Sequence, residues 1–155
     1  KYPLSESVHK NLLKLYLNDV GMLTSQLYHH NLRPLLGDEQ SINLGSVYEN
    51  VVAQELKAHG HNLFYYDNRQ KGEVDFLIDD YSNLSILPIE VKSGKDYAIH
   101  SALNNLIAVK DYHVMSGLVL SNDREVFSDG KVNYMPIYYV MFLDSSGDNE
   151  KDIYF

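Results

Sequence analysis

Two short segments, residues 73–78 and 87–92, constrain the fold of this chain more than any other part of the sequence. In each segment, charged residues alternate with apolar ones. Successive side chains of a β-strand point to opposite faces of the sheet, so this alternation is typical of two strands with one apolar and one charged face. In the first strand, the pattern predicts Val74, Phe76 and Ile78 together on the apolar face.

The charged faces of these two predicted strands carry carboxylates and a lysine. Neighbouring strands lie about 4.8 Å apart, so Asp75 of the first strand meets Glu90 and Lys92 of the second if the two strands pair. Carboxylate oxygens are ligands that Mg²⁺ prefers, and a lysine cation stabilises negative charge that develops during phosphodiester hydrolysis. The sequence therefore predicts a metal site with Asp75 and Glu90 as ligands and Lys92 as a catalytic cation. Taken alone, residues 90–92 also fit an ordinary strand with solvent-facing charges.

A third carboxylate, Glu49, lies on a predicted helix over residues 41–59, which Gly60 ends. On a helical wheel, Glu49 falls inside an apolar stripe, whereas Glu55 falls at the periphery. The stripe consists of Gly45, Val52, Ala53 and Leu56. An isolated charge is costly to bury, so a carboxylate in this position needs a compensating cation. We therefore expect Glu49 to be a further metal ligand, either direct or through water.

Hydrophobic periodicity predicts further helices and strands around the same core. Helices are expected at residues 22–29 and 99–111, and strands at residues 14–17, 62–66, 85–92 and 113–120, with a final strand or short helix at residues 132–143. The order helix, three strands, helix, strand indicates an α/β sandwich in which helices flank a central mixed sheet.

The composition fits one domain of 155 residues. We expect residues 41–143 to form its core, residues 1–40 to form a lead-in packed on that core, and residues 144–155 to form a polar tail. With 13 basic and 21 acidic residues, the formal net charge is −8, which argues against a broad basic surface for nucleic acid. A local basic patch stays an open alternative; it would consist of Arg69, Lys71, Lys92 and Lys95.

Three further observations limit the kind of protein. The absence of cysteine excludes disulfides and thiolate metal sites. No apolar run approaches the roughly 20 residues of a membrane helix, so we expect a cytoplasmic protein without a membrane partner. The chain begins at Lys1 rather than Met, from which we expect it to be part of a longer protein.

His59 and His61 are expected in a surface turn at the end of the predicted helix.

The charged constellation carries a family resemblance. Asp75, the strand segment 90–92 and the helical Glu49 resemble the PD-(D/E)XK nuclease superfamily, whose core has the same order of elements; Val74 stands where the superfamily pattern has Pro. Four longer motifs resemble one bacterial and archaeal family in which a domain of unknown function follows an AAA+-type ATPase module. These motifs lie at residues 14–21, 45–50, 72–76 and 89–94.

The resemblance implies a restriction-endonuclease-like fold and metal-dependent hydrolysis of DNA. It places Mg²⁺ or Mn²⁺ on Asp75, Glu90 and Glu49, with Lys92 as a catalytic residue. It also implies a larger ATPase, with ATP bound only in an N-terminal module, because no P-loop pattern G-x-x-x-x-G-K-[ST] occurs in these residues. The alternative is a catalytically inactive nuclease fold that acts as a regulatory or protein-interaction module. A weaker alternative is an oligomer, formed through residues 134–142 of a dimerisation domain.

Overall fold

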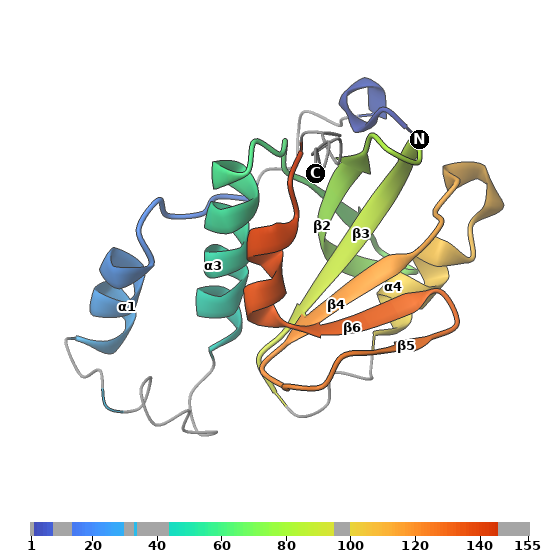
Figure 1. The fold of residues 1–155 in the computed structure, drawn as a ribbon. Helices are drawn as coiled ribbons and strands as arrows, with labels where there is room; N and C mark the ends of the chain where they lie inside the picture. The colour runs from blue at the N-terminus through green and yellow to red at the C-terminus, as the bar shows by residue number, and fades with distance from the viewer. Residues whose placement is uncertain (1, 8–13, 30–32, 34–43, 95–99, 146–155) are drawn as a thin grey trace, which may run out of the picture.

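In the described part of the chain, a mixed six-stranded β-sheet has helices on both faces (Figure 1). The computed structural model describes residues 2–7, 14–29, 33, 44–94 and 100–145. The strands are β1 (Phe64–Asn68), β2 (Gly72–Asp80), β3 (Ser85–Lys92), β4 (Gly117–Ser121), β5 (Phe127–Asp129) and β6 (Val132–Pro136). They lie in the order β1-β2-β3-β4-β6-β5. The first three are antiparallel, β4 is parallel to β3 and β6, and β5 is antiparallel to β6.

Helical segments cover both faces of this sheet. They are η1 (Leu4–Ser7), α1 (Val20–Tyr28), α3 (Gly45–Ala58), α4 (Ser101–Ile107), η2 (Lys110–Tyr112) and η3 (Ile137–Phe142). On one face, Leu56 of α3 and Val140 of η3 share a buried apolar cluster with Ile89 of β3. On the other face, Leu103 of α4 packs in a second cluster with Val119 of β4. The predicted mixed sheet flanked by helices is confirmed.

Helix α3 ends as the sequence predicts. Gly60 adopts φ +84°, a left-handed conformation that favours glycine. Its N–H donates to the Lys57 carbonyl at 3.1 Å, and the His61 N–H donates to the Leu56 carbonyl at 3.0 Å. This Schellman pattern satisfies carbonyls that the end of a helix otherwise leaves free. Residues 41–43 of the predicted helix lie outside the described residues.

Several predicted boundaries shift. Strand β3 covers the predicted residues 85–92, but β4 starts at Gly117 because His113 takes a left-handed backbone conformation, φ 57°, after η2. The helix predicted at 99–111 is shorter, since α4 ends at Ile107 and η2 is a separate turn; residue 99 lies outside the described residues. The last segment contains both of its alternatives, β6 followed by η3. Strand β5 has only three residues, all exposed, and the pattern did not predict it.

The strand predicted at residues 14–17 is wrong. This segment belongs to neither a strand nor a helix. Its partner is a side chain rather than a sheet: the Leu17 N–H donates to Asn50 Oδ1 of α3, and Asn50 Nδ2 donates to the Leu17 carbonyl, both at 2.8 Å. After this contact, Asp19 caps α1 by accepting from the Met22 N–H at 3.0 Å, which starts the predicted helix slightly early.

Strand β2 contains an irregularity that the alternation rule did not anticipate. Against β1, Phe64 aligns with Leu77 and Tyr66 aligns with Val74, so β2 has one extra residue between these pairs. Such a bulge turns the residues on its two sides toward different faces. Val74 therefore packs in the α4 cluster, whereas Phe76 packs in the α3 cluster. The prediction that Val74 shares a face with Phe76 is wrong for this reason.

The ends of the predicted domain are only partly described. Lys95 of the proposed basic patch and residues 146–155 of the predicted tail lie outside the described residues. His61 is buried, and its Nε2 lies 2.7 Å from the Leu143 carbonyl, so the expectation of a surface turn is wrong for this histidine. No described helix has both the length and the apolar character needed to cross a membrane.

Candidate functional site

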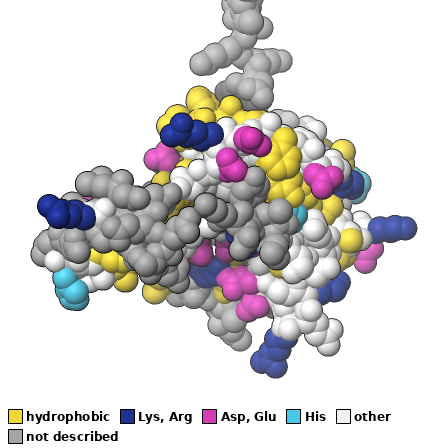
Figure 2. Space-filling model, turned by 90° about the horizontal axis from the view of Figure 1, so that it is seen from below, with side chains coloured by type: hydrophobic (Ala, Val, Ile, Leu, Met, Phe, Trp, Pro, Cys, Tyr) yellow, Lys and Arg dark blue, Asp and Glu magenta, His cyan; other side chains and the backbone are white. Residues whose placement is uncertain are grey.

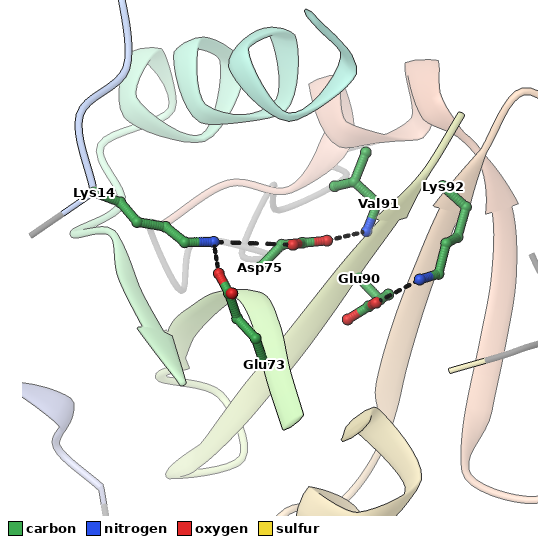
Figure 3. A network of polar contacts seen from close by, with 6 residues as sticks. All are labelled: Lys14, Glu73, Asp75, Glu90, Val91 and Lys92. Atoms are coloured by element: carbon green, nitrogen blue, oxygen red, sulfur yellow. Dashed lines mark hydrogen bonds and ion pairs between the residues drawn. The ribbon is translucent and has the colours of Figure 1, made fainter. Parts of the chain in front are cut away.

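Asp75 lies where strands β2 and β3 stop pairing with each other. The β2–β3 register runs from Asp80 opposite Ser85 to Phe76 opposite Ile89. One residue further along, Asp75 Oδ2 accepts a hydrogen bond from the main-chain N–H of Val91 at 2.8 Å (Figure 3). A carboxylate side chain thus satisfies a strand N–H at the position where the ladder ends. The bulge in β2 is what frees Asp75 for this role.

Glu90 and Lys92 come from the end of β3 and contact each other directly. Lys92 Nζ donates to Glu90 Oε1 at 2.7 Å, as Figure 3 shows. The Glu90 side chain is only 8% exposed, and its second oxygen, Oε2, is buried without a hydrogen-bond partner among the residues that the structure describes. Buried carboxylate oxygens are normally paired, so an unpartnered one points to a group that belongs there, such as a cation or water.

Asp75 and Glu90 influence each other electrostatically. Burial raises the pKa of Asp75 from its ordinary 3.8 to about 6, with a further contribution from the nearby Glu90 carboxylate. The Val91 N–H, Lys14 and Lys92 lower this pKa and offset part of the effect. The structure thus brings the Asp75 carboxylate to the main chain of Val91, the residue between Glu90 and Lys92, and Lys92 is hydrogen-bonded to Glu90.

Glu49 of α3 lies within electrostatic reach of the Asp75 carboxylate. Burial raises the pKa of Glu49, and the Asp75 carboxylate raises it further, while Lys14 lowers it. However, among the residues that the structure describes, no three His, Cys, Asp or Glu side chains gather closely enough to hold a metal ion. Glu49 is thus near Asp75 but does not form one ligand set with Asp75 and Glu90. Its role as a metal ligand stays a prediction.

Lys14 is the site residue that the sequence interpretation missed. Its ammonium group forms an ion pair with Glu73, lies 4.0 Å from Asp75 Oδ1 and sits 5.3 Å from the centre of the Tyr65 ring. Burial lowers the pKa of Lys14, but its hydrogen bond and attraction to Glu73, together with Asp75 and Glu49, raise it above the ordinary value. The sequence around Lys14 shows only a basic residue before alternating apolar positions. Because Lys14 lies far from Asp75 along the chain, this pattern did not predict that the two side chains are close.

Tyr16 reaches the site from the same segment. Its ring lies 5.4 Å from the Phe76 ring, centre to centre, and its hydroxyl is buried with no hydrogen-bond partner in the described part of the chain. Burial raises the pKa of Tyr16, and the Glu49 and Asp75 carboxylates raise it further.

The charges of this site do not balance. Among the described residues, four carboxylates, those of Glu49, Glu73, Asp75 and Glu90, interact with two ammonium groups, those of Lys14 and Lys92. The excess is negative, and part of it is buried. Such an environment attracts cations, and its donor atoms are all oxygens, which suit Mg²⁺ or Mn²⁺ better than softer metals.

Comparison with known proteins places the chain in a family. A family model described as a domain of unknown function, DUF4143, matches residues 44–140. The chain belongs to the DUF4143 family. The DUF4143 match includes Glu49, Asp75, Glu90 and Lys92, whereas Lys14 precedes the matched segment. No curated protein matches the chain.

Proposed function

We propose that this DUF4143 domain is a PD-(D/E)XK nuclease-like domain that hydrolyses phosphodiester bonds of DNA with Mg²⁺ or Mn²⁺. The observation that carries the proposal is the buried, unpartnered Oε2 of Glu90 beside Asp75, on the strand that also carries Lys92. The fold is restriction-endonuclease-like in this proposal. The order of one helix, three antiparallel strands, a helix and a parallel strand around this site supports it.

The residues present fit a hard divalent cation. Asp75 and Glu90 would hold the metal, since Glu90 Oε2 has no hydrogen-bond partner among the described residues and Asp75 Oδ1 lies 4.0 Å from Lys14 Nζ. Mg²⁺ is usually held by one or two carboxylates together with waters and substrate oxygens, so a pair of protein ligands is sufficient. Glu49, which lies near Asp75, would contribute through water in this arrangement.

The roles of the residues follow from their positions. When bound, the metal acidifies a water molecule and offsets charge that develops on the phosphate. Asp75, with a pKa of about 6, is mostly ionised above pH 7 and available as a ligand. Lys92 is held at the site by Glu90 and stabilises negative charge on the phosphate oxygens as a fixed cation.

DNA is proposed as the substrate through the family resemblance. On the face seen in Figure 2, the described Lys and Arg side chains are dispersed rather than gathered in one patch. With a net charge of −8, the domain gains little from non-specific attraction to phosphates. We therefore propose that an N-terminal AAA+-type ATPase module of the same protein, where ATP would bind, delivers the nucleic acid to this site.

Cleavage of plasmid and oligonucleotide DNA in the presence of Mn²⁺ tests the proposal. The variants are Asp75→Asn, Glu90→Gln and Lys92→Met, with Asp67→Asn, an exposed acidic residue of β1, as the matched control. We expect cleavage by the wild type and the control, and a loss of roughly 100-fold or more in the other three, because Asp75→Asn and Glu90→Gln each remove a metal-ligand charge and Lys92→Met removes the cation at the phosphate. Equal rates in all variants would contradict the proposal.

A second function is favoured by one other observation. Three large apolar side chains of η3 are exposed: Tyr138 by 54%, Met141 by 48% and Phe142 by 68%. A catalytically inactive module that couples a protein partner to the ATPase would use such a surface. Calorimetry separates the two functions, because Mn²⁺ binding that Glu90→Gln abolishes supports the nuclease, whereas a site indifferent to metals supports the interaction module.

A further inference from the structure

Residues 14–17 form an extended strap across helix α3. Asn50, which is only 2% exposed, holds the strap by hydrogen bonds to both main-chain groups of Leu17 at 2.8 Å. A buried amide that pairs with both groups of one residue fixes the register of the strap against the helix. The strap therefore approaches the carboxylate site in a defined position.

The side chains of the strap alternate between the site and solvent. Lys14 faces the carboxylates and Tyr16 packs against Phe76, whereas Leu15, 84% exposed, and Leu17, 37% exposed, face outward. Alternation in an extended segment places residues two apart on the same side. An apolar residue as exposed as Leu15 gains nothing from its position, so the contacts of Lys14 and Tyr16 account for the orientation of the strap.

The ammonium group of Lys14 occupies the acidic site much as a bound cation would. It pairs with Glu73 and lies 4.0 Å from Asp75 Oδ1, while the Glu90 side chain, 92% buried, keeps an unpartnered oxygen in the same cluster. A divalent ion on Asp75 would lie close to this ammonium group and would be repelled by it. The site therefore binds each cation more weakly when the other one is present.

We propose that Lys14 is a resident cation of the carboxylate site and competes there with a divalent metal ion. This inference rests on the metal site of the proposed function. Coupling between two binding events is reciprocal. Docking of the strap therefore lowers the affinity of the site for the metal ion, and the bound metal ion lowers the affinity of the strap for the site by the same factor. A partner that displaces residues 14–17 would thus raise the metal affinity of the site.

Titration of the full chain with Mn²⁺, followed by electron paramagnetic resonance at pH 7.5 and fixed ionic strength, tests this inference. We expect Lys14→Met to lower the dissociation constant for Mn²⁺ at least about fivefold, within the usual range of coupling between sites. Asn50→Ala, which releases the strap, should produce a similar change. Lys14→Arg, which keeps the charge, and Leu15→Ala, which alters the outward face, should leave the affinity unchanged.

The possible results separate this inference from the metal site itself. Unchanged or weaker Mn²⁺ binding in Lys14→Met would overturn the competition, and Lys14 would then form an ordinary ion pair of little energetic consequence. If Glu90→Gln still abolished Mn²⁺ binding in that case, the metal site would stand without the competition. A chain that binds no Mn²⁺ either as wild type or as Lys14→Met would overturn both.

Discussion

The main-chain N–H of Val91 donates a hydrogen bond to the Asp75 carboxylate at 2.8 Å. This contact joins the bulged end of β2 to the part of β3 that carries Glu90 and Lys92. The strands therefore separate at a fixed point, and the charged side chains of both meet there. The consequences of this arrangement for stability can be measured without knowing the substrate.

Asp75→Asn should stabilise the protein above neutral pH. Burial and Glu90 raise the pKa of Asp75 from 3.8 to about 6, so the folded state binds the proton more tightly than the unfolded state. Wild-type stability therefore falls as pH rises from about 4 to 6, and this loss persists above pH 6. Asparagine avoids it and keeps an acceptor for the Val91 N–H.

We expect Asp75→Asn to exceed the wild type by about 1–3 kcal/mol in free energy of unfolding at pH 7.5, since one pKa unit corresponds to about 1.4 kcal/mol. The difference should shrink toward pH 4. Urea unfolding followed by far-ultraviolet circular dichroism across this range measures it. A difference that does not change with pH would show that Asp75 has an ordinary pKa.

Lys92→Met should destabilise the protein because it leaves the Glu90 carboxylate without its cation. The substitution removes the 2.7 Å hydrogen bond and leaves both oxygens of a buried carboxylate without a partner. We expect a loss of about 2 kcal/mol, below the 3–5 kcal/mol typical of a fully buried pair, because Lys92 is partly exposed. In a Glu90→Gln background the same substitution should cost little. A double-mutant cycle by urea unfolding measures the coupling, and additive losses would contradict the predicted pairing.

Gly72→Ala should destabilise the start of β2. Gly72 adopts φ +91°, and an added Cβ would lie 2.9 Å from the Ala102 Cβ of α4. Backbone strain of this kind costs about 1–3 kcal/mol, and the close contact adds to it. Gly94→Ala is the matched control, because a Cβ there meets no atom within 4 Å. Thermal unfolding compares the two, and equal midpoints would argue against a tight approach of α4 to β2.

Asn50→Ala should release the strap at residues 14–17. The variant loses both hydrogen bonds to Leu17, which we expect to cost about 1–2 kcal/mol because the freed Leu17 groups reach water. The amide hydrogen of Leu17 should also exchange with solvent faster than in the wild type. Ser46→Ala, at an exposed position of the same helix, should change stability by less than about 0.5 kcal/mol. Unaltered Leu17 exchange in Asn50→Ala would mean that other contacts hold the strap.

Much of the site was predictable because it follows from local patterns. Alternation along β3 identified Glu90 and Lys92, and helical periodicity identified Glu49 as a carboxylate on an apolar face. These rules need only neighbouring residues. The predicted boundaries of β3 were correct because the turn before Ser85 and the polar residues after Lys92 limit it on both sides.

What the sequence did not reveal depends on contacts between distant segments. The bulge that separates Val74 from Phe76 arises from the pairing of β1 with β2, which no local pattern encodes. Residues 14–17 have the alternation of a strand, but the Asn50 side chain binds Leu17 in place of a neighbouring strand. Lys14 joined the site for the same reason, since only the folded chain brings it to Asp75.

In the proposed function, Asp75 and Glu90 together bind a divalent metal ion. A crystal structure of the protein grown with Mn²⁺, with an anomalous difference map recorded near the manganese absorption edge, tests it most directly. We predict one peak in contact with both carboxylates, with Glu90 Oε2 as a ligand. A saturated crystal with no peak between these side chains, or with manganese bound only elsewhere, would contradict the claim.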